Sequence, residues 1–253
     1  MLHNNKYINT IKRLVIKVIK TVAIFFVVWF SIFWAENKST FQNPNIIING
    51  TLVLNEGNYI NYLKSLKFDS TKIESNFILE SLYNHPYVAA ARISHRYPNT
   101  IIIDISERLP FAILNKDPMV ILDQECYVLP NIENINDYNI PILSKYNVAP
   151  ELYPLGKQSL SVKIKKTISW LKILNAKYPE LYSEISEITL ASGDEIILIL
   201  EKNPTKIMLG NHNTFHKLEI LKNFKNTLNN KKEITDYAYL DMRYNNQIIA
   251  KEL

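Results

Sequence analysis

Residues 85–110 read HPYVAAARISHRYPNTIIIDISERLP, and this stretch decides the fold of the first globular unit. Two segments, 91–97 and 100–106, flank the dipeptide Pro98-Asn99, which is typical of a tight turn. Within the second segment, 100–106, one set of side chains (Ile101, Ile103, Ile105) alternates with another (Ile102, Asp104, Ser106). Because a period of two marks a strand with one buried face, the stretch predicts an antiparallel strand hairpin.

The residues before this hairpin predict a strand and two helices. Residues 45–50 form a short apolar run that ends at glycine, and a helical pattern follows around 59–63. Thr71 and Glu74 have the spacing of a capping box at the start of a second helix. The apolar stripe of that helix consists of Ile73, Phe77, Ile78 and Leu82, and Pro86 ends the pattern. This order predicts a compact α+β unit with two helices on one face of a small sheet.

Beyond residue 110 the pattern changes to short strands, longer loops and two helices. The expected strands lie at 119–122, 126–129, 185–190, 195–200, 206–209, 237–244 and 247–251. A helix is expected over 160–178, with Ile164, Ile168, Leu171 and Leu174 inward and Lys163, Lys165, Lys166 and Lys172 outward. Another is expected from a Thr214 cap to 228, with Phe215, Leu218, Leu221 and Phe224 buried. The second unit is therefore predicted to be a mixed β-sheet with packed helices.

The N-terminal segment predicts one membrane-spanning helix. Residues 21–35 read TVAIFFVVWFSIFWA without a charge, and starting the span at 18 brings it to a length that crosses a bilayer. Residues 1–17 then form a basic tail, 18–35 the transmembrane helix, and 36–44 a polar linker. Since basic residues precede the span and the first acid follows it, the positive-inside rule predicts a cytoplasmic N-terminus and an extracytoplasmic bulk.

A cleaved signal peptide is the competing interpretation of this segment, because it has the same order of basic and apolar regions. Phe33, Trp34 and Ala35 offer a small residue at only one of the two positions of a cleavage site, which favours a retained anchor. A core helix of a soluble protein would show a polar face, and this segment has none.

Net charge and cysteine content exclude several classes of protein. The formal net charge is +5, but residues 36–253 carry 24 basic and 24 acidic side chains, so the excess lies in the N-terminal segment. A neutral bulk lacks the main electrostatic contribution to non-specific nucleic-acid binding, and no nucleic-acid partner is expected. Cys126 is the only cysteine, which excludes an internal disulfide and a cysteine zinc cage and favours a small buried hydrophobe.

A catalytic function finds little support in the sequence. Motifs for a nucleophile elbow, a dinucleotide site, a phosphate loop or a zinc protease are absent, and the chain has only five glycines. His212 and His216 are the best metal candidate by their spacing of four, but no third ligand has suitable spacing, so surface histidines are favoured. His85 and His95 are expected at a cap and at the surface. The expected catalytic residues, cofactors and metal ligands are therefore none.

Three stretches together resemble a known family. They are the hairpin at 85–110, VILDQECYVLP at 120–130 and YLDMRYNNQIIAK at 239–251, preceded by the basic tail and the single span. Over nearly its whole length the chain resembles the bacterial division proteins of the FtsQ family, called DivIB in Gram-positive bacteria. The most specific pieces are Glu107-Arg108-Leu109-Pro110, the surroundings of Asp123, and Leu240 to Tyr244. The chain departs from the family at Glu125-Cys126, where the family usually has a glycine.

The resemblance implies a POTRA domain over 45–109 and an FtsQ-type β domain over 110–253. It also implies a non-enzymatic scaffold, anchored in the cytoplasmic membrane at the division septum, that joins the DivIC-type division proteins FtsB and FtsL. Such scaffolds help control the septal peptidoglycan synthase FtsW and its transpeptidase partner FtsI. The POTRA unit would serve recruitment through the helix 71–83 and the strand 88–96, because a small sheet leaves an open edge.

The resemblance also places partner contacts on the C-terminal strands. The segment 247–251 is too short to cover its neighbour, so its free backbone groups would accept a strand of FtsB by β-augmentation. The implied partner-binding residues are Tyr239, Arg243, Tyr244, Asn246, Gln247 and Ile248. Arg243 would offer a charge-assisted fork to a partner carboxylate, and Tyr244 a broad amphipathic contact. The alternative is that Arg243 is a solvated strand residue and both tyrosines lie in the core.

Two other functions stay open at this point. A POTRA-containing envelope assembly or translocation factor is expected to carry repeated POTRA units or a membrane β-barrel, whereas one unit is expected here. A membrane-anchored envelope hydrolase would assemble its active site from residues distant in sequence, which motif searches do not detect. Turnover of cell-wall material by the purified ectodomain would favour the hydrolase over the scaffold.

Overall fold

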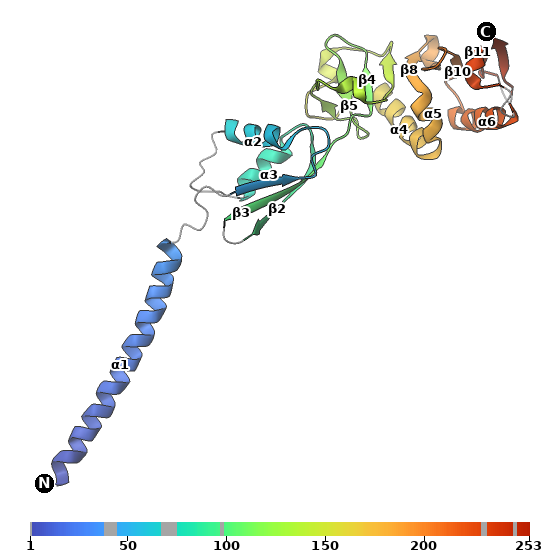
Figure 1. Cartoon of the computed structure of the whole chain (residues 1–253). Coiled ribbons are helices and arrows are strands. Elements are labelled where there is room, and N and C mark those ends of the chain that lie inside the picture. Colours follow the sequence, from blue (N-terminus) through green and yellow to red (C-terminus); the bar gives the residue numbers. More distant parts are fainter. Residues whose placement is uncertain (1, 38–44, 67–74, 97–98, 229–231, 245–246) are drawn as a thin grey trace.

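The computed structural model describes residues 2–37, 45–66, 75–96, 99–228, 232–244 and 247–253. Helix α1 (Leu2–Asn37) is one continuous helix at the N-terminal end of the ribbon in Figure 1. Its stretch Leu14–Trp34 has 21 residues, and it is long and apolar enough to cross a membrane. At 1.5 Å per residue, such a helix reaches the roughly 30 Å thickness of the hydrocarbon core. The predicted span lies within this helix.

A three-stranded sheet follows, in the order β1-β3-β2. β1 (Asn45–Asn49) pairs parallel with β3 (Thr100–Glu107), and β2 (Val88–Arg96) pairs antiparallel with β3. Helices α2 (Glu56–Ser65) and α3 (Ser75–Tyr83) lie over one face of this sheet in Figure 1. The alternating isoleucines of β3 are buried in one cluster with Tyr59, Ile78 and Leu82 of these helices. The unit is POTRA-like, and the predicted order of elements is confirmed.

Parts of the predicted helix 71–83 differ from expectation or lie outside the described residues. Phe77 is predicted to be buried but is 43% exposed, because α3 turns Ile78 and Leu82 toward the sheet instead. Thr71, Ile73 and Glu74, and with them the predicted capping box, fall in 67–74, outside the described residues.

A nine-stranded mixed sheet forms the second unit, in the order β12-β11-β10-β9-β8-β7-β4-β5-β6. Its strands are β4 (Ala112–Leu114), β5 (Val120–Leu122), β6 (Val128–Leu129), β7 (Ile142–Ser144), β8 (Ile185–Leu190), β9 (Ile196–Leu200), β10 (Lys206–Gly210), β11 (Tyr237–Asp241) and β12 (Ile249–Glu252). The pairs β4–β7, β7–β8 and β10–β11 are parallel. The predicted mixed sheet is confirmed, but β4 and β7 are missed. They pair in parallel, so no tight turn between them marks the pair in the sequence.

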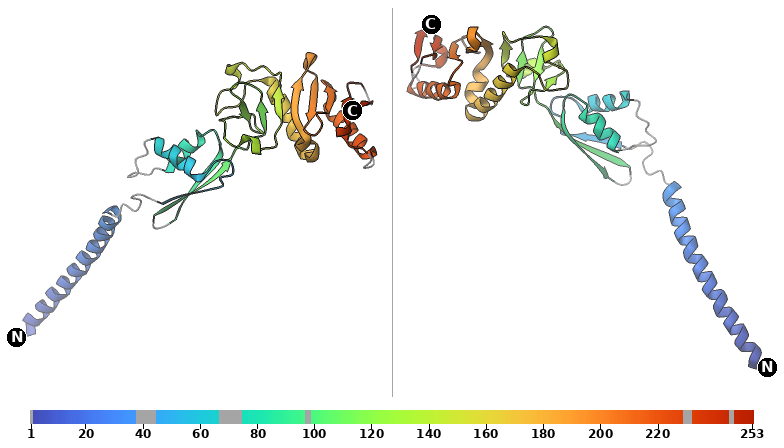
Figure 2. Two further views of the ribbon diagram at one scale, coloured as in Figure 1. Left: turned by 45° about the horizontal axis from the view of Figure 1, so that its top comes forward. Right: turned by 180° about the vertical axis from the view of Figure 1, so that it is seen from behind.

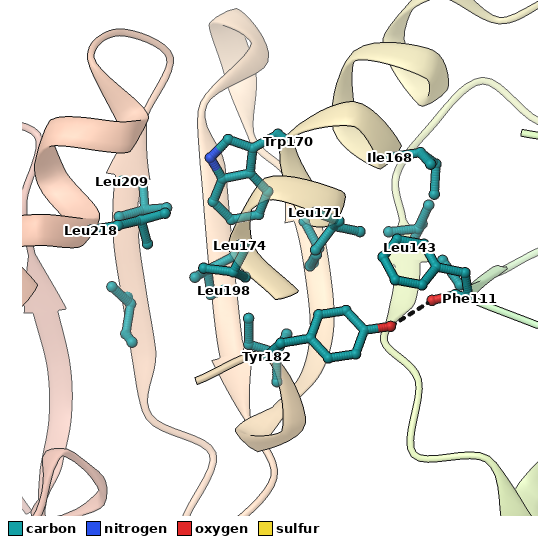
Figure 3. Packing of buried hydrophobic residues seen from close by; sticks show 14 of the residues in the cluster. Phe111, Leu143, Ile168, Trp170, Leu171, Leu174, Tyr182, Leu198, Leu209 and Leu218 are labelled. Atoms are coloured by element: carbon teal, nitrogen blue, oxygen red, sulfur yellow. Dashed lines mark hydrogen bonds between the residues drawn. The ribbon is translucent and has the colours of Figure 1, made fainter. Parts of the chain in front are cut away.

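Helices pack against the middle of this sheet and form the main core. They are α4 (Val162–Lys177), α5 (Pro179–Glu184) and α6 (Thr214–Thr227), and 3₁₀ turns lie at Ile135–Asp137, Pro150–Leu152, Ser192–Asp194 and Ile234–Asp236. Figure 3 shows Leu171 and Leu174 of α4 beside Leu198 of β9. In the same view Tyr182 of α5 donates a hydrogen bond of 2.9 Å to the carbonyl of Phe111. The four predicted inward residues of α4 are fully buried, as expected for an amphipathic helix.

Helix α6 buries a different set of side chains from the predicted one. Leu218 and Leu221 are buried as expected, but Phe215 is 44% exposed. Lys217 is buried in its place, and its ammonium donates a 2.7 Å hydrogen bond to the carbonyl of Leu209. The N-cap is Asn213 rather than Thr214, so the first turn of the helix begins one residue earlier than predicted.

The two sheets meet at a junction built from the ERLP segment and its neighbours. The hydroxyl of Tyr87 donates a 2.6 Å hydrogen bond to the carbonyl of Pro130. Arg108 pairs with Asp123 at 2.9 Å, and its guanidinium lies 3.4 Å from the centre of the Tyr127 ring. Since both partners of that ion pair are largely buried, the junction has a defined geometry. In both views of Figure 2 the C-terminus lies at the end of the large sheet remote from this junction.

His85 contributes to the same region more than a cap would. Its Nδ1 accepts a 3.3 Å hydrogen bond from the backbone N–H of Tyr87, in the turn between α3 and β2, so the side chain does not cap α3 as predicted. Its ring also packs against Tyr59 and Tyr62, with centroid distances of 4.9 and 4.7 Å. Burial lowers the pKa of His85, so the neutral imidazole is the form that packs there.

Candidate partner-binding edge

Strand β12 is the last strand of the nine-stranded sheet. It pairs antiparallel with β11, with Tyr239 opposite Lys251 and Asp241 opposite Ile249. All four residues of β12 are exposed, and within the described residues β11 is its only neighbouring strand. An edge strand directs half of its backbone N–H and C=O groups away from the sheet. The predicted strand 247–251 therefore corresponds to an edge strand, shifted toward the C-terminus by one or two residues.

Strand β11 ends earlier than the sequence predicts. It runs to Asp241 rather than to 244, so Arg243 and Tyr244 belong to the connection between the last two strands. Leu240 and Met242 are buried in the core cluster, which fixes the inward face of this segment. Tyr244 is 55% exposed, so the alternative that places both tyrosines in the core is wrong for this residue.

Asp241 and Arg243 form a compact pair within this connection. The carboxylate of Asp241 accepts hydrogen bonds from the backbone N–H and from Nε of Arg243, at 3.0 and 2.9 Å. A third bond joins Nη2 of Arg243 to Oδ2 of Asp241 at 2.7 Å. The Arg243 hydrogen bonds hold the pKa of Asp241 below its usual range. The fork predicted for a partner carboxylate is thus already engaged within the chain.

Two further charges surround this pair, and the sequence analysis missed both. Nη1 of Arg243 lies 3.5 Å from Oε2 of Glu195, and the ammonium of Lys217 lies close to Gly210 beside Arg243. Gly210 has a φ of +75°, and a Cβ there would meet both Arg243 and Lys217 at about 3.5 Å. These are ordinary van der Waals distances, so the positive φ, and not the available space, favours glycine here. A lysine beside an apolar stripe is usually solvated, so the sequence gives no signal that Lys217 is buried.

The remaining predicted contact residues lie on or beside the same edge. Tyr239 is half-buried on β11, Gln247 is exposed, and Ile248 is half-buried against the main core. Asn246 lies outside the described residues. The structure therefore places five of the six predicted residues in β11 or its connection to β12, with Tyr244 as the most exposed large side chain among them.

The candidate metal ligands and the cysteine named from the sequence do not form a site in the part of the chain that the structure describes. Within those residues no group of three or more His, Cys, Asp and Glu side chains could hold a metal ion. His216 is exposed and lies 3.8 Å from Glu219 on its own helix. Burial raises the pKa of the Cys126 thiol to about 11, with Asp123 adding to the shift, so the thiol stays protonated and unreactive at neutral pH.

The architecture and this edge define a class of protein. The chain is an α+β protein in which a helix able to span a membrane precedes a POTRA-like unit and a mixed-sheet unit. Residues 112–251 match the family described as FtsQ/DivIB, C-terminal related, which is more than half of the chain. The chain belongs to the FtsQ/DivIB family of cell division proteins.

Several curated relatives carry the same family names. The chain is similar to the cell division protein FtsQ of Syntrophotalea carbinolica, with 25% identity over 72% of this chain and 60% of the relative. It is 24% identical to FtsQ of Geotalea daltonii over 69% of this chain and 62% of that protein. DivIB of Clostridium tetani is 30% identical over 48% of this chain and 43% of its own length. The chain thus covers about 60% of the first two relatives.

Proposed function

We propose that this chain is a non-enzymatic scaffold of the bacterial division machinery. Residues 18–35 anchor it in the cytoplasmic membrane, with the basic tail inside and the linker 36–44 leading to the outer units. Family membership supports the role in division. The five basic residues before Thr21 and the acid directly after the span support this orientation. The POTRA domain covers 45–109 and the β domain 110–253.

The partner of the β domain is an FtsB-type protein, which adds a strand to β12. The observation that carries this proposal is the exposed β12, which has β11 as its only neighbour among the described residues. Main-chain hydrogen bonds to such an edge give affinity, and alternate side chains give specificity. The side chains of the added strand would contact Tyr239, Tyr244, Gln247 and Ile248. FtsL joins the same complex, and FtsW with FtsI is controlled through it.

The candidate role of Arg243 takes a more specific form than the sequence suggested. Its guanidinium is shared between Asp241 and Glu195, and the contact to Glu195 is the longer of the two, at 3.5 Å against 2.7 Å. Glu195 precedes β9, three strands in from β12, so a partner strand paired with β12 lies on the other side of Arg243. Arg243 would release its longer contact to Glu195 to meet a partner carboxylate, while its shorter and less exposed bonds to Asp241 stay in place.

The POTRA domain serves recruitment to the septum through its open edge. β2 is an edge strand of the small sheet, and most of its residues are exposed. α3 packs beside it, so the predicted surface on 71–83 and 88–96 is continuous where it is described. Deleting 45–109 should disperse a fluorescent fusion from midcell. A fusion that stays concentrated there would contradict this assignment.

Site-specific photo-crosslinking tests the proposed edge in cells. A benzoyl-phenylalanine in place of Ile249 on β12 should form an adduct with the FtsB-type protein. The matched control carries the same residue in place of Lys166, which is exposed on α4 away from the edge. An FtsB adduct at 249 and none at 166 is the expected result. Adducts of equal yield at both positions, or none at 249, would overturn the proposed site.

A further inference from the structure

Lys217 of α6 is the only buried lysine among the described residues, with 6% of its surface exposed. A lysine is seldom fully buried unless its charge is paired, because the removal of an ammonium group from water is costly. The Lys217 ammonium donates a 2.7 Å hydrogen bond to the carbonyl of Leu209 in β10. This bond engages one of the three N–H donors of an ammonium and leaves its charge unbalanced. Carboxylates nearby must therefore supply the opposite charge.

Two carboxylates balance the charge of Lys217. They belong to Asp241, the last residue of β11, and to Glu195, which directly precedes β9. Burial lowers the pKa of Lys217, and the negative charges of Asp241 and Glu195 act in the opposite direction. The hydrogen bonds from Arg243 are the main reason that the pKa of Asp241 is lowered, and the positive charge of Lys217 adds to the effect. A buried cation and a more exposed one thus act on the same two acids.

The two basic side chains also approach the same point of the backbone. Nζ of Lys217 lies 3.5 Å, and Cγ of Arg243 lies 3.4 Å, from the position that a Cβ of Gly210 would have. Two cations beside one residue repel each other in a partly buried site unless acids lie between or beside them. The two acids and the two bases together form a neutral cluster, which we call the Gly210 charge cluster.

A partner carboxylate at Arg243 would change the balance of the Gly210 charge cluster. It would add a third acid, and Glu195 would lose its 3.5 Å contact with Arg243. Without Lys217, one cation would then serve three acids. With Lys217 in place, two cations serve them, and Glu195 keeps a positive charge nearby after Arg243 turns away. Lys217 therefore lowers the free-energy cost of breaking the contact between Arg243 and Glu195.

We propose that Lys217 is a positioning residue for partner binding at the β12 edge. Its ammonium keeps the Gly210 charge cluster balanced, so that Arg243 can leave Glu195 for a carboxylate of the partner strand while its bonds to Asp241 persist. Lys217 is buried and acts through Arg243 rather than by touching the partner. This inference rests on the proposed function, because it assigns Lys217 a role in the binding of FtsB.

Calorimetry with the full chain in lipid nanodiscs and the FtsB ectodomain tests the proposal. Lys217→Met removes the charge and keeps an unbranched apolar stem. It should weaken FtsB binding by about tenfold or more, the range measured for coupled charges at interfaces. The matched control is Lys222→Met, which removes an exposed charge from the same helix and should leave the affinity unchanged. Equal affinities of wild type and Lys217→Met would overturn the proposal.

A second substitution separates charge balance from packing. Glu195→Gln removes one acid, so Lys217→Met combined with Glu195→Gln again has one acid and one base in the cluster. The double variant should therefore recover most of the affinity that Lys217→Met loses. A packing defect at Lys217 would persist in the double variant, because Glu195→Gln fills no space at that position. A double variant as weak as Lys217→Met would contradict the proposal.

Glu195→Gln alone provides a test that does not depend on the stability of the Lys217 variant. The Glu195 side chain is one-third exposed, so the fold tolerates this change. FtsB should bind Glu195→Gln at least as tightly as wild type, because Arg243 no longer has to leave a carboxylate. Weaker binding would overturn the role of the cluster. Failure of wild type to bind FtsB would instead overturn the proposed function, and this inference with it.

Discussion

Asp241 is only 7% exposed at the candidate edge, and Arg243 stabilises its negative charge. The hydrogen bonds from Arg243 lower the pKa of Asp241. A carboxyl whose folded pKa is lowered stabilises the fold fully above its ordinary pKa of about 4 and loses that contribution as the pH falls through the folded value. Asp241→Asn should therefore lower the free energy of unfolding by about 1–3 kcal/mol at pH 7.

Urea unfolding at pH 7 and pH 3 measures this effect. The difference between wild type and Asp241→Asn should be smaller at pH 3, because this pH lies below the ordinary carboxyl pKa of about 4, where the unfolded chain binds a proton and part of the stabilisation by the charge is lost. Asp194→Asn is the control, because Asp194 pairs with Lys163 while its side chain is 58% exposed. An equal difference at both pH values would show that the Asp241 charge does not stabilise this turn.

Glu107 joins three backbone amides and one phenol in the POTRA-like unit. Its carboxylate accepts hydrogen bonds from the backbone N–H groups of Leu52, Val53 and Leu54. It also accepts a 2.5 Å hydrogen bond from the hydroxyl of Tyr59. Glu107→Ala leaves three part-buried backbone donors and the buried Tyr59 hydroxyl without their acceptor and should destabilise the chain by at least about 3 kcal/mol. Thermal unfolding checks this, with exposed Glu151→Ala expected to change stability by about 0.5 kcal/mol or less. Equal unfolding temperatures for the two variants would contradict this role.

The paired state of Arg243 and the anchoring role of Glu107 were beyond sequence reasoning. Alternation along a predicted strand 237–244 places Asp241 and Arg243 on one face, but it does not show that the strand stops at 241 and lets them pair. Glu107 lies at a strand end, where a carboxylate is ordinarily solvated. Its partners come from 52–59, a segment that only the folded sheet brings near.

Among the elements, α4 shows that a long amphipathic pattern predicts both the extent of a helix and its buried face. Its predicted bounds of 160–178 are close to the observed Val162–Lys177, and the inward residues are correct. Ser161 caps this helix by accepting a hydrogen bond from the backbone N–H of Ile164. Ser161→Ala should cost about 1 kcal/mol of stability. Ser169→Ala, at an exposed position on the same helix, should be neutral or slightly stabilising.

Chemical unfolding of the two serine variants separates capping from helix propensity. The expected order of stability is Ser169→Ala, equal to or above wild type, and then Ser161→Ala. If Ser161→Ala were as stable as wild type, the first turn of α4 would not depend on this cap. Strands β4 and β7 were not predicted, because pairing with other strands, and not a local pattern, defines them.

At the β12 edge, Tyr244 offers the cleanest test of partner contact. It is exposed and carries no charge, so Tyr244→Ala should leave the fold intact while weakening FtsB binding by about 1–2 kcal/mol. An Arg243→Glu reversal would weaken binding too, but it also faces Asp241 and Glu195 and would disturb the connection. Calorimetry with Tyr83→Ala as an exposed tyrosine control checks the prediction. Unchanged affinity for Tyr244→Ala would remove Tyr244 from the site.

For the molecule as a whole, the junction sets how the two units move together. Tyr87→Phe removes the hydrogen bond to Pro130 and leaves a partly buried carbonyl without that donor. The distance between spin labels on the two units should then spread over a wider range. Tyr83→Phe removes a comparable but exposed bond to Ala91 within one unit and should leave the distribution unchanged. Equal distributions in both variants would show that Tyr87 does not fix the junction.

The division into an apolar helix and two α+β units was predictable, because each depends on local periodicity. The junction was not, since Tyr87, Arg108 and Asp123 meet only after both sheets form. The open edge formed by β12 was predictable only in part. The short length of the last strand predicted the edge, but the arrangement of the side chains around it depends on where β11 ends.

Amide hydrogen exchange of the full chain in nanodiscs tests the central claim most directly. The measurement compares residues 249–252 with and without a saturating FtsB ectodomain. If a partner strand pairs with β12, exchange of the β12 amides that point away from β11 should slow by at least about tenfold, because paired edge amides become protected. Exchange in β6, at the opposite end of the sheet, should not change. Binding of FtsB with unaltered exchange in β12 would contradict strand addition at this edge.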